Sequence, residues 1–193
     1  MDYTSQPEGE KMIRAKKMML WFGIVGLAMM FAGLTSAYIV SKERRDWLTD
    51  FELPQAFYIS TAVIVLSSLT MFLAKRAIKG NAVGRAKIFL AATLLLGIVF
   101  VYMQFVGFDE IIANGYFFTG SESNITTSFI YAFVIAHITH VVAGIIVLMV
   151  MFVNTMRSKY SPDDMLGISL GSTFWHFVDV LWVYLFLFLV FFK

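Results

Sequence analysis

Five apolar runs of at least 20 residues alternate with short polar stretches along the chain. They cover residues 18–40, 55–74, 88–108, 128–153 and 169–192. About 20 apolar residues of helix cross a hydrocarbon core of about 30 Å, so each run is long enough to span a membrane. Membrane β-strands would instead be segments of about ten residues that alternate in hydrophobicity. The pattern therefore predicts an all-α fold, in which five transmembrane helices form a single polytopic membrane domain over residues 1–193.

The distribution of charge supports this interpretation. The chain has 15 Lys and Arg residues and 13 Asp and Glu residues, and 59% of its residues are hydrophobic. Of these charged residues, only Asp179 lies within an apolar run. A soluble domain spreads charge along its amphipathic helices, so this segregation excludes an ordinary soluble globule. The absence of cysteine excludes disulfides, thiolate metal sites and iron–sulfur clusters.

The basic residues outside the runs predict the orientation of the helices. One side of the membrane would carry 11 of them: Lys11, Arg14, Lys16, Lys17, Lys75, Arg76, Lys79, Arg85, Lys87, Arg157 and Lys159. The other side would carry four: Lys42, Arg44, Arg45 and Lys193. The positive-inside rule then places the N-terminus in the cytoplasm and the C-terminus outside. We interpret the basic loops as topology signals that contact lipid headgroups, not as a nucleic-acid-binding surface.

Small residues within the runs predict which helix faces contact other helices, because they let backbones approach closely in a membrane. In the fourth run, every fourth position on one face is small or a histidine: Ala132, Ala136, His140 and Gly144. His137 lies one turn before His140 and flanks the same face. In the first run, the residues that predict such a face are Gly26, Gly33 and Ala37.

Polar side chains of the third, fourth and fifth runs predict a structural polar seam, defined by Gln104, His137, His140, Trp175, His176 and Asp179. His176 and Asp179 are three residues apart, so they project from one face of the fifth helix. A carboxylate at membrane depth is costly and faces a partner or water. At 1.5 Å per residue, the fourth-helix histidines reach a depth comparable to that of Asp179. We hypothesise that His137 or His140 shares a polar cluster with His176 and Asp179.

Three histidines and an aspartate also invite a metal or haem interpretation, since imidazole binds zinc, copper and iron. No further acids or soft ligands complete a metal site, so we expect structural histidines and no catalytic, cofactor-binding or metal-binding residue on this chain. One haem held by a histidine from each of two helices is conceivable, which leaves a haem-binding membrane electron carrier as a distant alternative. A transporter is disfavoured, because all three prolines lie outside the runs and no half of the chain repeats.

The segment Trp175-His176-Phe177-Val178-Asp179-Val180-Leu181-Trp182 closely resembles the last-helix signature of subunit III of the haem–copper terminal oxidases. His137-Ile138-Thr139-His140-Val141 with Gly144 resembles the family's His-x-x-His-Val-x-x-Gly pattern. The segment from Leu96-Gly97 through Gln104 to Glu110 is similar to a further family segment, and Ala32-Gly33 to Tyr38 resembles the family more weakly. The resemblance covers about residues 15–192.

The resemblance implies an accessory, cofactor-free subunit in the plasma membrane (inner membrane) of a bacterium. Haem and copper would lie on its partners, catalytic subunit I and subunit II, in a proton-pumping cytochrome c oxidase of aerobic respiratory electron transport. The subunit would stabilise subunit I, support proton uptake and contact membrane lipids, within a respiratory supercomplex where one exists. Equivalent subunits of a quinol oxidase, or a nitric-oxide-reductase accessory protein, are alternatives that the chain alone does not separate.

The chain departs from the family pattern in three places. It has five spans, whereas longer members have seven, and the two missing helices form one wall of a lipid-holding cleft. Leu27 aligns with the membrane-embedded glutamate of the family's first shared helix, and Gly107 replaces the glutamate that follows Gln104. Arg157, at the inner end of the fourth run, is a candidate for binding a lipid headgroup.

Overall fold

The structure is a computed structural model that describes residues 7–44, 47–48, 53–118, 124–162 and 164–192. It consists of five long helices: α1 (Glu8–Ser41), α2 (Gln55–Lys79), α3 (Val83–Ala113), α4 (Ile125–Met156) and α5 (Leu166–Phe191). All five are long and apolar enough to cross a membrane. The prediction of an all-α bundle with five membrane-spanning helices is therefore confirmed. Of the basic residues that predict the orientation, Arg45 and Lys193 lie outside the described residues.

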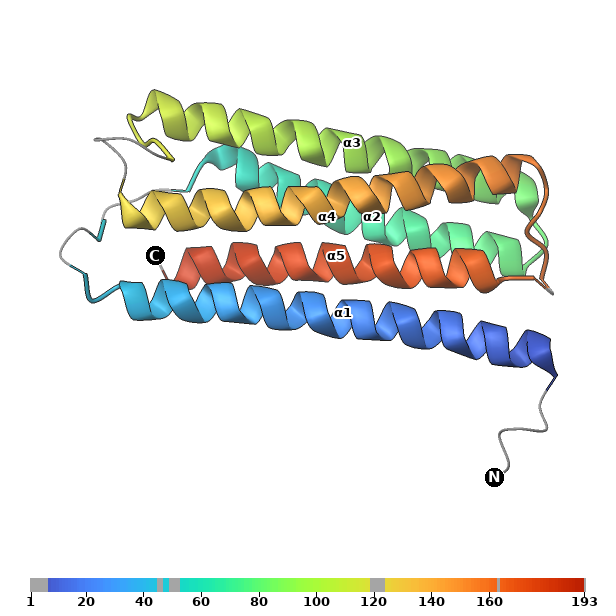
Figure 1. The fold of residues 1–193 in the computed structure, drawn as a ribbon. Coiled ribbons are helices and arrows are strands. Elements are labelled where there is room, and N and C mark those ends of the chain that lie inside the picture. The colour runs from blue at the N-terminus through green and yellow to red at the C-terminus, as the bar shows by residue number, and fades with distance from the viewer. Residues whose placement is uncertain (1–6, 45–46, 49–52, 119–123, 163, 193) are drawn as a thin grey trace.

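The helices run side by side with their axes close to parallel, and α1 lies at one edge of the bundle (Figure 1). Among the described residues, α1 contacts only α4 and α5, whereas α2 and α3 form the most extensive helix pair. The start of α1 and the end of α5 lie at opposite ends of the bundle, as an odd number of spans requires (Figure 1).

Each helix extends beyond its apolar run at one end or at both, most of all α1, which begins at Glu8 instead of residue 18. An apolar run marks only the part of a helix that hydrocarbon surrounds. The helical backbone satisfies its own hydrogen bonds, so the helix continues into the headgroup region, where charged side chains are solvated. The runs therefore located the spans correctly but underestimated the helices.

A tight turn joins α2 to α3 and fixes them as an antiparallel pair. Asn81 adopts a left-handed conformation with φ of 54°, which asparagine tolerates better than most residues. The N–H of Ala82 then donates to the carbonyl of Ala77 over 2.9 Å, closing the end of α2. Deeper in the membrane, the hydroxyls of Thr70 and Thr93 lie 2.8 Å apart and link the two helices. Thr93 also donates to the carbonyl of Phe89 in its own helix.

The contact face of α1 differs from the one predicted. Gly26, Gly33 and Ala37 are exposed, and a Cβ added to either glycine would meet nothing within 4 Å. The buried residues of α1 are instead Ile24, Phe31, Thr35 and Tyr38. A peripheral helix needs only one narrow stripe of contacts, and here large side chains fill it. Small residues indicate that close approach is permitted, but they do not show that it occurs within this chain.

Candidate functional site: the polar seam around helix α5

Trp175 of α5 lies where four helices meet, and it is 1% exposed. Its indole N–H donates to the hydroxyl of Ser67 in α2 over 3.0 Å. A Cβ added to Gly97 of α3 would lie 2.8 Å from Cη2 of the indole, and one added to Gly144 of α4 would lie 3.0 Å from Cε3 and Cζ3. The indole ring is therefore held between two glycines from different helices, and neither position has room for a side chain.

Trp182 of α5, two turns after Trp175, also contacts three other helices. Its indole N–H donates to the hydroxyl of Thr61 in α2 over 3.0 Å. Its ring centroid lies 5.1 Å from that of Phe100 and 5.0 Å from that of His137. The two tryptophans thus fix α5 to α2 by hydrogen bonds and to α3 and α4 by packing.

His137 is the most buried of the three histidines, with no exposed surface. Its ring lies among the rings of Phe31, Phe100 and Trp182, at centroid distances of 6.5, 5.9 and 5.0 Å. Neither ring nitrogen has a hydrogen-bond partner among the described residues. Aromatic packing therefore positions His137, and its polar atoms contribute no bond to the fold.

His140 is only half-buried, although its place in the stripe of small residues predicted that it faces a neighbouring helix. Its Nδ1 atom lies 2.7 Å from the carbonyl oxygen of Ala136, one turn earlier in the same helix, and donates to it. Its ring also packs edge-on against Phe31 at 6.0 Å. The register of α4 turns His137 into the bundle and leaves His140 nearer its margin.

His176 and Asp179 face α2. The Nδ1 atom of His176 lies 2.6 Å from the hydroxyl of Ser68. The Asp179 carboxyl, 3% exposed, also lies beside Ser68, but its two oxygens have no partner that meets hydrogen-bond geometry. Lys75, two turns closer to the end of α2 than Ser68, interacts electrostatically with His176. Ser68 is thus the common neighbour of the two polar groups of α5.

The seam consequently has two parts. No hydrogen bond among the described residues joins His137 or His140 to His176 or Asp179. The first part is the aromatic cluster around His137, and the second is the contact of His176 and Asp179 with α2. In the described part of the chain, no group of three or more His, Cys, Asp or Glu side chains is arranged to hold a metal ion.

Gln104 and Arg157 lie away from both parts. Gln104 is fully buried in α3 and donates through Nε2 to the hydroxyl of Ser60 in α2 over 2.9 Å, while its Oε1 atom has no partner among the described residues. Arg157 is an exposed residue at the C-terminal cap of α4. Gln104 therefore belongs to the contact between α2 and α3, and Arg157 stays a predicted headgroup ligand.

The hydrogen-bond partners on α2 are the residues whose role sequence reasoning missed. Ser60, Thr61, Ser67 and Ser68 are small residues in an apolar run, which indicated close packing only. Each of them bonds a polar side chain of α3 or α5. Ser60 and Ser67 are seven residues apart, as are Thr61 and Ser68 and also Trp175 and Trp182, and this shared spacing is the signal that could have indicated paired faces.

We expect His137→Phe to leave the free energy of unfolding unchanged or to raise it by about 1–3 kcal/mol, because it replaces an unpartnered buried polar ring by an apolar one. SDS unfolding of the purified chain, followed by circular dichroism, measures this. His140→Phe is the control, since the His140 ring hydrogen-bonds only to its own helix. A loss of more than about 1 kcal/mol in His137→Phe would mean that the ring nitrogens bind a polar partner such as water.

A family model described as cytochrome c oxidase subunit III matches residues 46–193. Cytochrome c oxidase subunit 3 of Bacillus sp. (strain PS3) is 25% identical over 190 residues, which are 95% of this chain and 90% of the relative. The probable cytochrome c oxidase subunit 3 of Nocardia farcinica is 32% identical over 82% of this chain and 78% of its own length.

A relative from another oxidase type is similar as well. Subunit 3 of the cytochrome bo(3) ubiquinol oxidase of Pseudomonas aeruginosa is 33% identical over 136 residues, which are 70% of this chain and 63% of the relative. Sequence similarity therefore reaches subunits of both a cytochrome c oxidase and a ubiquinol oxidase.

Proposed function

The chain belongs to the cytochrome c oxidase subunit III family, and we propose that it is the accessory, cofactor-free subunit of a proton-pumping haem–copper oxidase. Membership of this family makes it a membrane-embedded subunit of a terminal oxidase complex. In the proposal, it stabilises catalytic subunit I, supports proton uptake and contacts subunit II and membrane lipids. Haem and copper lie on the partner subunits.

One observation carries this proposal: the most characteristic family residues act in packing within the chain. Trp175 occupies the space left by Gly97 and Gly144 and bonds Ser67. Trp182 and His176 bond further α2 hydroxyls. Residues used in this way hold four of the five helices, α2 to α5, in a fixed arrangement, which is what a subunit that supports a larger neighbour requires.

The outer surface supports the same proposal. Large apolar side chains are exposed on every helix, for example Trp21 of α1, Tyr102 of α3 and Val180 of α5. Such surface suits lipid and the apolar helices of partner subunits. The distribution of basic loop residues supports an N-terminus in the cytoplasm and a C-terminus outside, in the plasma membrane of a bacterium.

For the electron donor, we propose cytochrome c. The family model carries the name cytochrome c oxidase, and so do relatives that are matched over 90% and 79% of their own length, against 63% for the ubiquinol oxidase subunit. A quinol oxidase is the second candidate, and the relative from Pseudomonas aeruginosa favours it. The partner subunits of the chain distinguish the two candidates. A copper-binding electron-entry subunit among them would indicate cytochrome c as the donor, because such a subunit accepts electrons from cytochrome c.

The test is isolation of the tagged chain from native membranes in mild detergent, with partner identification and a reduced-minus-oxidised haem spectrum. We expect a large haem–copper subunit in the isolate and no haem on the chain once the partners are stripped away. Haem that stays on the stripped chain would overturn the proposal and favour the electron carrier. A variant with His137, His140 and His176 all replaced by phenylalanine then shows whether those rings hold the haem.

A further inference from the structure

Two open cavities lie on the surface of α2 where it adjoins α5. One has a volume of about 360 Å³ and is lined by Phe72, Lys75, Arg76, Lys79 and Met165. The other has a volume of about 690 Å³ and is lined by α2 residues between 58 and 69, together with Phe186 of α5. Leu69 and Phe72 lie one turn apart on the exposed face of α2 and connect the two. We call this feature, from residue 58 to residue 79 of α2, the outer groove.

The two ends of the outer groove differ in charge. At the end where α2 finishes, the cavity holds three cationic side chains, Lys75, Arg76 and Lys79. No acidic residue occurs between positions 53 and 108 of the sequence. Asp164, next to Met165, lines a different cavity with Lys17, between α1 and α5. Among the described residues that line the cationic end of the groove, none is acidic.

The rest of the outer groove is apolar over the length of a lipid leaflet. Val65, Leu69 and Phe72 are each about half exposed, at 53%, 53% and 54%. Ten residues of helix, from Phe72 to Ala62, rise about 15 Å, which is half of a hydrocarbon core of about 30 Å. An acyl chain whose headgroup lies at the cationic end would thus run along this face to the middle of the bilayer.

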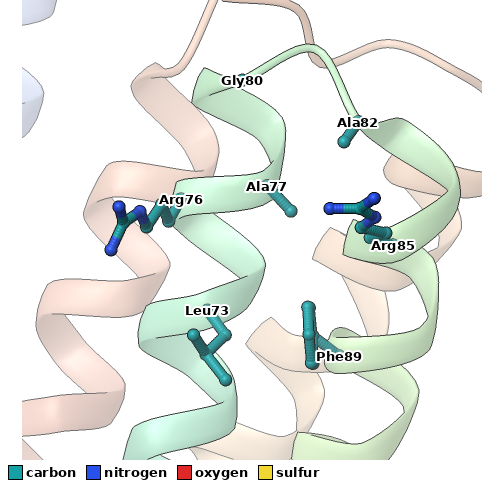
Figure 2. Close-up of a pocket in the computed structure, with 7 residues that line it drawn as sticks. All are labelled: Leu73, Arg76, Ala77, Gly80, Ala82, Arg85 and Phe89. Atoms are coloured by element: carbon teal, nitrogen blue, oxygen red, sulfur yellow. The ribbon is translucent and has the colours of Figure 1, made fainter.

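A neighbouring cavity of about 360 Å³ between α2 and α3 lacks this combination. Figure 2 shows the guanidinium of Arg85 in that gap, pointing toward Ala77, while the guanidinium of Arg76 points away from α3. Arg76 lines both cavities, but its charge lies on the side of α2 away from α3. Arg85 and Lys87, in the first turns of α3, therefore provide a natural comparison, because they carry the same charge at the same end of the bundle but lie outside the outer groove.

We propose that the outer groove binds a phospholipid with an anionic headgroup, whose phosphate contacts Lys75, Arg76 and Lys79 and whose acyl chain lies along Phe72, Leu69 and Val65. The cationic end of the groove matches the anionic headgroup of such a lipid, and the apolar part, which is as long as one leaflet, matches its acyl chain. The proposal does not depend on the proposed function, since the groove belongs to this chain alone.

The test uses the purified full chain in nanodiscs that contain phosphatidylglycerol and phosphatidylcholine in equal amounts, with retained lipid identified by native mass spectrometry. We expect retained phosphatidylglycerol to exceed phosphatidylcholine. Arg76→Gln/Lys79→Gln should weaken its retention on the order of 30-fold, since each basic side chain near an anionic lipid contributes about a fivefold gain. The matched control Arg85→Gln/Lys87→Gln removes the same charge and should change retention by less than about threefold.

A phosphatidylglycerol with a photoreactive acyl chain adds a test of position, and the expected crosslinks lie between residues 62 and 72. Equal losses in the two double variants would overturn the proposal, because diffuse basic charge would then attract the lipid. Equal retention of phosphatidylcholine would overturn it as well. If the intact complex from native membranes lacks a lipid that the purified chain binds, a partner subunit covers the groove and the proposal fails.

Discussion

Replacing Trp175 by alanine is expected to lower the free energy of unfolding of the chain by about 3–5 kcal/mol, the cost of truncating a large core aromatic. In a membrane, helices are held together by close packing and interhelical hydrogen bonds, and Trp175 supplies both at one point. The variant opens a cavity between Gly97 and Gly144 and leaves the hydroxyl of Ser67 without the indole N–H. SDS unfolding of the purified chain in mild detergent, followed by circular dichroism, measures the loss.

Trp21→Ala is the matched control, because Trp21 of α1 is 59% exposed and the same truncation there removes no side chain of the buried core. We expect it to change the free energy of unfolding by less than about 0.5 kcal/mol. Trp175→Phe keeps most of the ring and loses the hydrogen bond, so an intermediate loss of about 1–3 kcal/mol is expected. If Trp175→Ala were no more destabilising than Trp21→Ala, the joint of four helices would not exist as described.

Apolar runs and the spacing of α5 predicted much of this arrangement. A run of 20 or more apolar residues has one stable solution in lipid, because a helix satisfies its own backbone, so the number and order of the spans followed directly. The spacing of His176 and Asp179 correctly placed them on one face, toward a neighbouring helix. The spacing did not show which neighbouring helix that face contacts. The structure shows that it contacts α2, through Ser68.

The same limit explains the differences in α1 and α4. Periodicity shows that residues share a face, but the rotation of a helix in its bundle depends on the side chains of every helix around it. For α4, the large ring of Trp175 occupies the space at Gly144, and His137 turns inward among aromatic rings while His140 lies nearer the margin. For α1, no described residue of the chain covers Gly26 or Gly33. These glycines are free for a partner or for lipid, which one sequence cannot distinguish.

Asp179→Leu is expected to raise the free energy of unfolding of the isolated chain by about 1–3 kcal/mol while it weakens assembly with the catalytic subunit. The carboxyl is 3% exposed and has no hydrogen-bond partner among the described residues, so burying it costs free energy that leucine would recover. A group that lowers the stability of its own chain is retained where the assembled complex uses it. SDS unfolding measures the first effect, and the yield of the complex from native membranes measures the second.

Asp164→Leu is the control for Asp179→Leu, since Asp164 is an exposed loop residue and its replacement should alter neither quantity. Asp179→Asn keeps the shape and hydrogen-bonding capacity of the side chain without its charge, and so separates a need for polarity from a need for a carboxyl. If Asp179→Leu destabilised the isolated chain, the carboxyl would be bonded to Ser68 and its role would lie in the fold. If the complex formed normally but its haem spectrum changed, Asp179 would lie near a cofactor of the partner, and the separation of this chain from the redox chemistry would be wrong.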